Sequence, residues 1–123
     1  MILAILDDLM FTSKIRSAAA HTGATVAFVR SAQGALDQMR AQTPALVILD
    51  LNNPRTNPLG IVAAMKADPT LASVPTMGYV SHVDTATIAA ARDAGVSDVM
   101  ARSGFAAALP GLLAAHAPSE PPA

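Results

Sequence analysis

Two short apolar segments of this chain each end in carboxylates, and these acids are the residues best suited to do chemistry. Segment 2–6 is followed by Asp7 and Asp8, and segment 46–49 is followed by Asp50. Continuous apolar runs of this kind fit strands that are buried on both faces of a parallel sheet. If the two strands are parallel neighbours, the three carboxylates meet at one sheet edge and repel one another unless a cation is bound. Oxygen ligands of this type suit a hard ion such as Mg2+.

Asp50 also has a plainer interpretation, because a dense cluster of turn formers follows it. An Asp in this position could simply cap the loop or the next helix. The acidic pair after segment 2–6 favours a functional role instead, since open α/β sheets bind their ligands at the carboxyl ends of strands. The turn formers are Asn52, Asn53, Pro54, Asn57 and Pro58.

The remaining segments predict the elements that bring these acids together. Five strands alternate with five helices, which predicts an α/β fold with a doubly wound, five-stranded parallel sheet in the order 2-1-3-4-5. In this order the first and third strands are neighbours, and the topological switch lies between them. The domain is expected to cover residues 1–116, followed by a disordered tail at 117–123. The expected strands are 2–6, 25–29, 46–49, 74–80 and 96–101, and the expected helices are 10–21, 31–42, 58–68, 84–95 and 103–115.

With these elements in place, the chain resembles the CheY-like receiver domain of two-component response regulators, across about residues 2–115. The resemblance rests on three features: the pair Asp7-Asp8 after the first strand, the run Leu-Asp-Leu-Asn-Asn-Pro at 49–54, and the basic residue Arg102 after the fifth strand. It implies a (βα)5, flavodoxin-like fold in which Asp50 attacks a phosphohistidine of a partner protein and becomes an acyl phosphate.

The resemblance also implies a metal site. Mg2+ would be held by Asp7, Asp8, Asp50 and the backbone carbonyl of Asn52, and in many members one acid of the pair acts through a bound water. A metal is needed beside the phosphoryl group because that group carries dispersed negative charge during transfer.

Three positions depart from the family pattern. The family's Lys-Pro is here Arg102-Ser103, and Arg is not a conservative replacement because its fork is planar and longer. Arg102 could clamp a phosphoryl oxygen, pair permanently with Asp50, or simply be a surface residue at a helix start. The hydroxyl expected after the fourth strand falls on Val80, so Ser81 serves only if the loop shifts by one residue. The aromatic switch position falls on Val99.

The composition limits the function classes. Apolar residues make up 52% of 123 residues, enough for the core of one domain. A net charge of −1 gives no bulk attraction to nucleic acid. The absence of Cys excludes disulfides, thiolate chemistry and cysteine-ligated metals. The first apolar run is too short for a signal peptide or a membrane span.

Several other residues are expected to be structural. Tyr79 is expected in the core, although it could replace the missing switch aromatic. His82 lies beside the acidic site and is expected to be a solvated loop residue, and no His has a partner at metal-ligand spacing. The methionines expected in the core are Met10, Met39, Met65, Met77 and Met100.

Two functions remain in competition. The first is a stand-alone receiver that takes phosphate at Asp50 from a histidine kinase or phosphotransfer protein. It would bind an output partner through the face formed by segments 84–95, 96–101 and 103–115, and would be no enzyme beyond slow autodephosphorylation. The second is a degenerate receiver that acts as a phosphorylation-independent interaction module, with Arg102 filling the pocket. A hydrolase ranks lower, because no Gly-rich phosphate loop is present. We expect a cytoplasmic monomer or weak homodimer that binds neither nucleic acid nor membrane directly.

Overall fold

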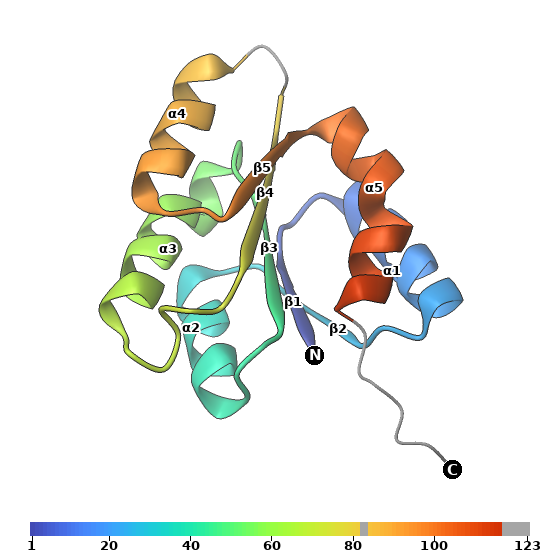
Figure 1. The fold of residues 1–123 in the computed structure, drawn as a ribbon, viewed down its shortest axis with the longest axis horizontal. Coiled ribbons are helices and arrows are strands. Elements are labelled where there is room, and N and C mark those ends of the chain that lie inside the picture. Colours follow the sequence, from blue (N-terminus) through green and yellow to red (C-terminus); the bar gives the residue numbers. More distant parts are fainter. Residues whose placement is uncertain (82–83, 117–123) are drawn as a thin grey trace.

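A five-stranded sheet forms the middle layer of the protein, and all of its strands run parallel (Figure 1). The computed structural model describes residues 1–81 and 84–116. The order β2-β1-β3-β4-β5 confirms the predicted fold class and strand order. The strands are β1 (Ile2–Ile5), β2 (Val26–Val29), β3 (Leu46–Asp50), β4 (Thr76–Val80) and β5 (Asp98–Ala101).

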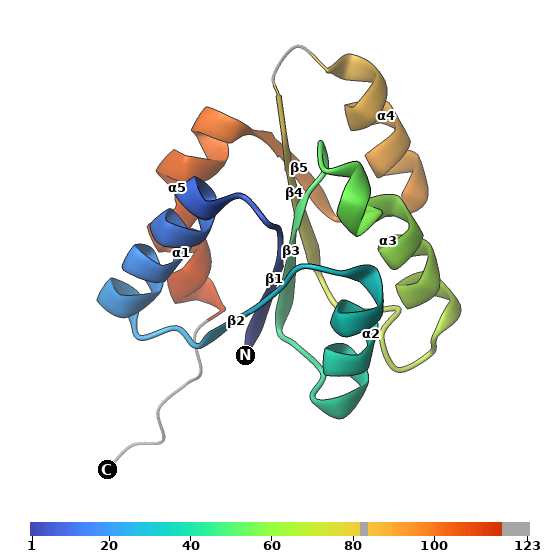
Figure 2. The ribbon, with the colours of Figure 1, turned by 180° about the vertical axis from the view of Figure 1, so that it is seen from behind.

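Helices cover both faces of the sheet, as a parallel sheet requires. α1 and α5 lie on one face, and α2, α3 and α4 lie on the other (Figures 1 and 2). Within the described residues, no helix is both long and apolar enough to cross a membrane. The helices are α1 (Leu9–Thr22), α2 (Ala32–Ala41), α3 (Pro58–Ala67), α4 (Thr85–Ala94) and α5 (Arg102–Ala115), and a short 3-10 helix, η1 (Pro54–Thr56), precedes α3.

Each face of the sheet has its own buried cluster of side chains, because successive residues of a strand point to opposite faces. β1 and β3 are buried along their whole length, which agrees with the continuous apolar runs in the sequence. Their register pairs Ile2 with Leu46 and Ile5 with Leu49. The carboxyl ends of the two strands are therefore level, and the residues after them share one edge of the sheet.

Some element boundaries differ from those predicted. β4 begins at Thr76 and β5 at Asp98 rather than at Val74 and Val96. Side-chain hydrogen bonds hold this end of the sheet, since Ser97 Oγ accepts from the Thr76 N–H at 3.0 Å and Thr76 Oγ1 accepts from the Ser97 N–H at 2.8 Å. α5 begins at Arg102, one residue earlier than predicted, and continues through Pro110, which lies in its interior.

One core prediction is wrong. Met10 is 66% exposed. It lies in the first turn of α1, beside the buried face formed by Phe11, Ile15 and Ala19. Met39, Met65 and Met77 are buried as expected, and Met100 is partly buried. The predictions for His82 and for the tail at 117–123 fall outside the described residues.

Candidate functional site

Asp50 is the last residue of the central strand β3, and it is only 5% exposed. Its Oδ1 accepts a hydrogen bond from the Asn52 N–H at 3.0 Å, which closes a tight turn. It caps no helix, because Asn53 caps η1 and Asn57 caps α3. Burial raises the pKa of Asp50 above its usual range, although the Asn52 N–H and the charge of Arg102 act in the opposite direction.

Asp8 and Arg102 lie beside Asp50. Asp8 is the N-cap of α1, and its Oδ1 accepts from the N–H groups of Met10 (2.8 Å) and Phe11 (3.3 Å). Arg102 Nη2 lies 3.7 Å from Asp8 Oδ2 and 4.0 Å from Asp50 Oδ2. Arg102 therefore divides its charge between two acids and does not pair with Asp50 alone.

The aromatic rings beneath Arg102 help to hold it there. Its guanidinium carbon lies 5.2 Å from the ring centroid of Phe11 and 5.9 Å from that of Tyr79, within the range of a cation–π interaction. Tyr79 is stacked between Phe11 and Phe105, with 4.8 Å between centroids on either side. The core position predicted for Tyr79 agrees with its complete burial.

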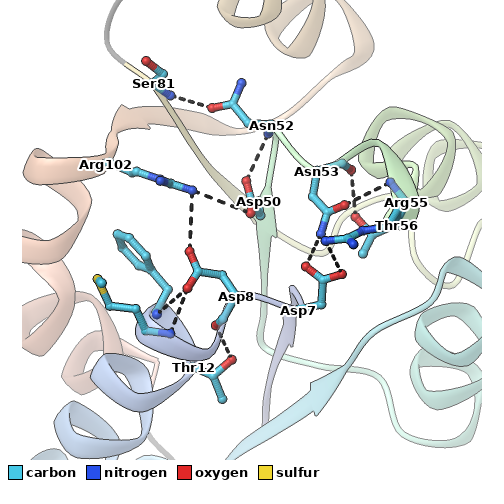
Figure 3. A network of polar contacts seen from close by, with 12 residues as sticks. Asp7, Asp8, Thr12, Asp50, Asn52, Asn53, Arg55, Thr56, Ser81 and Arg102 are labelled. Carbon is cyan, nitrogen blue, oxygen red and sulfur yellow. Dashed lines mark hydrogen bonds and ion pairs between the residues drawn. The ribbon is translucent and has the colours of Figure 1, made fainter.

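Asp7 has a second set of partners that the sequence did not indicate. Its Oδ1 accepts from Asn53 Nδ2 at 2.6 Å, and its Oδ2 lies 2.9 Å from Arg55 Nη2. Figure 3 shows Arg55 and Arg102 on opposite sides of the three carboxylates. Each oxygen of Asp7, Asp8 and Asp50 thus has a polar partner within the chain.

These residues line one pocket of about 400 Å³ at the end of the sheet. Its three carboxylates are hard oxygen donors, so the donor set fits Mg2+. In the part of the chain that the structure describes, no three His, Cys, Asp or Glu side chains are already gathered to hold a metal. Arg55 and Arg102 place two positive charges beside these carboxylates. The lining residues are Asp7, Asp8, Asp50, Asn52, Asn53, Pro54, Arg55 and Arg102.

Ser81 contacts the site through its backbone. Its N–H donates to Asn52 Oδ1 at 2.7 Å, while its hydroxyl points away from Asp50 in Figure 3. The preceding Val80 is the last residue of β4 and is completely buried. Val80 has no hydroxyl, and the hydroxyl of Ser81 does not reach Asp50, so neither residue supplies the hydroxyl that the family pattern expects there. Val99, at the position of the family's switch aromatic, is a partly buried strand residue.

The side chain of Asn52 also reaches α4. Its Nδ2 donates to Asp84 Oδ2 at 2.9 Å, and Asp84 caps α4 by accepting from the Thr87 N–H at 3.1 Å. The Thr87 hydroxyl and N–H lower the pKa of Asp84 below its usual range, and Asn52 adds to this effect. Sequence reasoning assigned only the backbone carbonyl of Asn52 a role.

Comparisons with known proteins agree with this geometry. A family model described as the response regulator receiver domain matches residues 2–109. The response regulator from Hahella chejuensis has a similar structure, with a TM-score of 0.82 at 20% identity over 91% of this chain and 90% of that one. The Mn(2+)-bound form of response regulator Rcp1 gives a TM-score of 0.78 at 17% identity over 99% and 98%.

A response regulator protein from Burkholderia multivorans is 29% identical, with a TM-score of 0.73 over 99% of this chain and 96% of that one. No curated protein sequence matches this chain. The likeness to the Hahella protein and to Rcp1 shows the fold alone. The family model covers most of the chain, and the strand order and the acids at the strand ends agree with it. The chain belongs to the response regulator receiver domain family of two-component signalling.

Proposed function

We propose that Asp50 is the phosphoacceptor of this receiver domain, and that its donor is the phosphohistidine of a histidine kinase or phosphotransfer protein. One observation carries the proposal. Asp50 ends the central strand at the topological switch of the sheet, in the same pocket as Asp7, Asp8 and Arg102. Ligands of open α/β sheets bind at this place.

The transfer requires the ionised form of Asp50. A carboxylate oxygen attacks the phosphorus, the phosphorus–nitrogen bond of the phosphohistidine breaks, and the imidazole leaves with a proton from solvent. The Asn52 N–H and Arg102 favour the carboxylate, and they oppose the effects of burial and of the two neighbouring acids on its pKa. The product is an acyl phosphate on Asp50.

A divalent cation would be held by Asp7, Asp8, Asp50 and the backbone carbonyl of Asn52. It would offset the negative charge of the transferring phosphoryl group. The donor set supports Mg2+, and response regulator Rcp1, a protein of the same fold, has a structure in an Mn(2+)-bound form. Arg102 takes the place of the family Lys and would contact a phosphoryl oxygen. Ser81 would act as a switch hydroxyl only after a rotation that brings its side chain toward Asp50.

The remaining parts of the proposal concern partners and place. We propose that residues 1–116 form one signalling domain that binds an output partner through α4, β5 and α5. Its chemistry would be limited to accepting phosphate and losing it slowly. It would act in the cytoplasm as a monomer or weak homodimer, without nucleic acid or membrane as a direct partner.

A second function is favoured by a specific observation. Two arginines already neutralise much of the acidic pocket, and no hydroxyl from Val80 or Ser81 reaches Asp50. A receiver in this condition could act as a phosphorylation-independent interaction module, because it lacks the usual contact that couples a phosphoryl group to a second state.

The test is labelling with acetyl phosphate in the presence of Mg2+, followed by intact-protein mass measurement. We expect the mass of one phosphoryl group on the wild type and none on Asp50→Asn. Asp68→Asn is the matched control, since Asp68 is a partly exposed acid at the end of α3 and lies outside the pocket. Labelling that survives in Asp50→Asn would place the nucleophile elsewhere.

Amide NMR with Mg2+ and then beryllium fluoride, a phosphoryl mimic, separates the two functions. Shifts at Asp7, Asp8 and Asp50 that extend into β4 and β5 support a working receiver. An absence of any response to beryllium fluoride, together with an absence of labelling, supports the interaction module.

A further inference from the structure

We propose that Arg55 is a built-in counter-ion that competes with divalent cations for Asp7, and so lowers the metal affinity of the pocket. The inference rests on the proposed function, because it concerns the same metal site. It adds a residue that the family resemblance does not point to.

The first observation is that both carboxylate oxygens of Asp7 already have partners within the chain. Its Oδ2 lies 2.9 Å from Arg55 Nη2, and its Oδ1 accepts from Asn53 Nδ2 at 2.6 Å. A cation that binds Asp7 directly therefore competes with the guanidinium and the amide for the lone pairs of these oxygens. The guanidinium is the easier to displace, because the Arg55 side chain is 77% exposed while Asn53 is buried.

The second observation is that the backbone directs Arg55 toward Asp7. Asn53 Oδ1 accepts from the Arg55 N–H at 2.9 Å, so one buried amide orients both members of the ion pair. The completely buried Thr56 donates its hydroxyl to the Asn53 carbonyl at 3.2 Å. η1 ends at Thr56, and the next residue, Asn57, has a φ of 49° that turns the chain into α3. The start of the Arg55 side chain is thus fixed, although its end is exposed.

The third observation is the charge balance. Three carboxylates line the pocket, and the two guanidinium groups approach them from opposite sides (Figure 3). An incoming divalent cation meets acids that are already largely compensated and is repelled by both arginines. Arg102 occupies the place of the family's basic residue, so Arg55 is the additional positive charge.

Metal binding to the full chain tests the role of Arg55. Isothermal titration calorimetry measures the dissociation constant of Mg2+, and water proton relaxation measures that of Mn2+. Neither measurement requires phosphorylation. We expect Arg55→Gln to bind both ions up to about fivefold more tightly, the fold-change that corresponds to an exposed ion pair. Arg55→Lys keeps the positive charge and should stay closer to the wild type than Arg55→Gln does.

Arg40→Gln is the matched control. It removes the same charge and breaks an Arg–Asp ion pair at Asp68 with an N–O distance of 3.7 Å, away from the pocket. It should leave the metal affinity unchanged. Equal affinities for wild type and Arg55→Gln, or equal gains in Arg55→Gln and Arg40→Gln, would overturn the role of Arg55 while the metal site stands. If neither wild type nor Arg55→Gln binds either ion, the proposed metal site itself fails, and the inference fails with it.

Discussion

Asn52 Nδ2 lies 2.9 Å from Asp84 Oδ2, and this bond joins the loop after β3 to the N-cap of α4. The same residue donates its backbone N–H to Asp50 and accepts from the Ser81 N–H. Asn52 therefore contacts the proposed phosphoacceptor, the end of β4 and the start of α4 at once. A change of charge at Asp50 acts directly on the hydrogen bond that it accepts from the Asn52 N–H.

Replacing Asn52 with Ala should weaken the link between the end of β4 and the N-cap of α4. The change removes the acceptor of the Ser81 N–H and one partner of Asp84, while the backbone bond to Asp50 is kept. We expect faster amide hydrogen exchange at Ser81 and Thr87 and a loss of stability of about 1 kcal/mol. Gln33→Ala, which removes an exposed amide–carboxylate bond to Asp37 in α2, is the control. Unchanged exchange at Ser81 would mean that the side chain of Asn52 does not protect this amide.

Asp50→Asn should stabilise the metal-free protein at neutral pH. Burial and the neighbouring acids Asp7 and Asp8 raise the pKa of Asp50, so its ionised form costs the folded state free energy. The gain should shrink as the pH falls through the raised pKa toward the ordinary value of 3.8, because Asp50 is then protonated like its neutral replacement. Urea unfolding in the presence of a chelator, from neutral to acid pH, measures this.

Asp68→Asn should change the stability of the protein in the opposite direction. Hydrogen bonds from the Thr70 hydroxyl and N–H, with a smaller contribution from Arg40, lower the pKa of Asp68. Its carboxylate therefore favours the folded state above pH 3.8, and this contribution is lost as the pH falls through the lowered pKa. Asp68→Asn should destabilise the protein at neutral pH and less so in acid. Equal signs for the two variants would contradict the environment described for Asp50.

Tyr79→Phe should stabilise the protein by about 1 kcal/mol. The Tyr79 hydroxyl is buried and, among residues 1–81 and 84–116, has no hydrogen-bond partner, so its removal relieves a desolvation cost. The stacking on Phe11 and Phe105 is kept. Thr76→Val is the contrasting variant, since it also removes a buried hydroxyl, but one that accepts from the Ser97 N–H. In thermal unfolding, the melting temperature of Tyr79→Phe should lie above that of the wild type, and that of Thr76→Val should lie below it.

The sequence predicted the fold and the meeting of the acids because both follow from backbone regularities. Continuous apolar runs indicated strands buried on both faces, and the alternation with helices limited the sheet to a few topologies. Once β1 and β3 are parallel neighbours, the carboxylates after them share one edge. No side-chain detail was needed for this.

The partners of Asp7 could not be predicted in the same way. Asn53 and Arg55 reach Asp7 through a local turn, and no periodicity specifies where loop side chains point. The only available signal was an Arg inside the cluster of turn formers after Asp50. The prediction that Met10 is buried failed because α1 buries the face formed by Phe11, Ile15 and Ala19, and Met10 lies one residue outside this i, i+4 spacing.

Arg102→Ala should separate phosphoryl binding from metal binding. Arg102 Nη2 is within 4.0 Å of both Asp50 and Asp8, where it would contact a phosphoryl oxygen on Asp50. Loss of a charged hydrogen bond of about 1.5–3 kcal/mol should weaken beryllium fluoride binding at saturating Mg2+ by at least about tenfold. Mg2+ affinity itself should not fall, because the substitution removes a positive charge from the pocket. Titrating Mg2+ first and beryllium fluoride second, by amide NMR, measures both on one sample. Equal losses of both ligands would mean that Arg102 maintains the shape of the pocket rather than contacting the phosphoryl group.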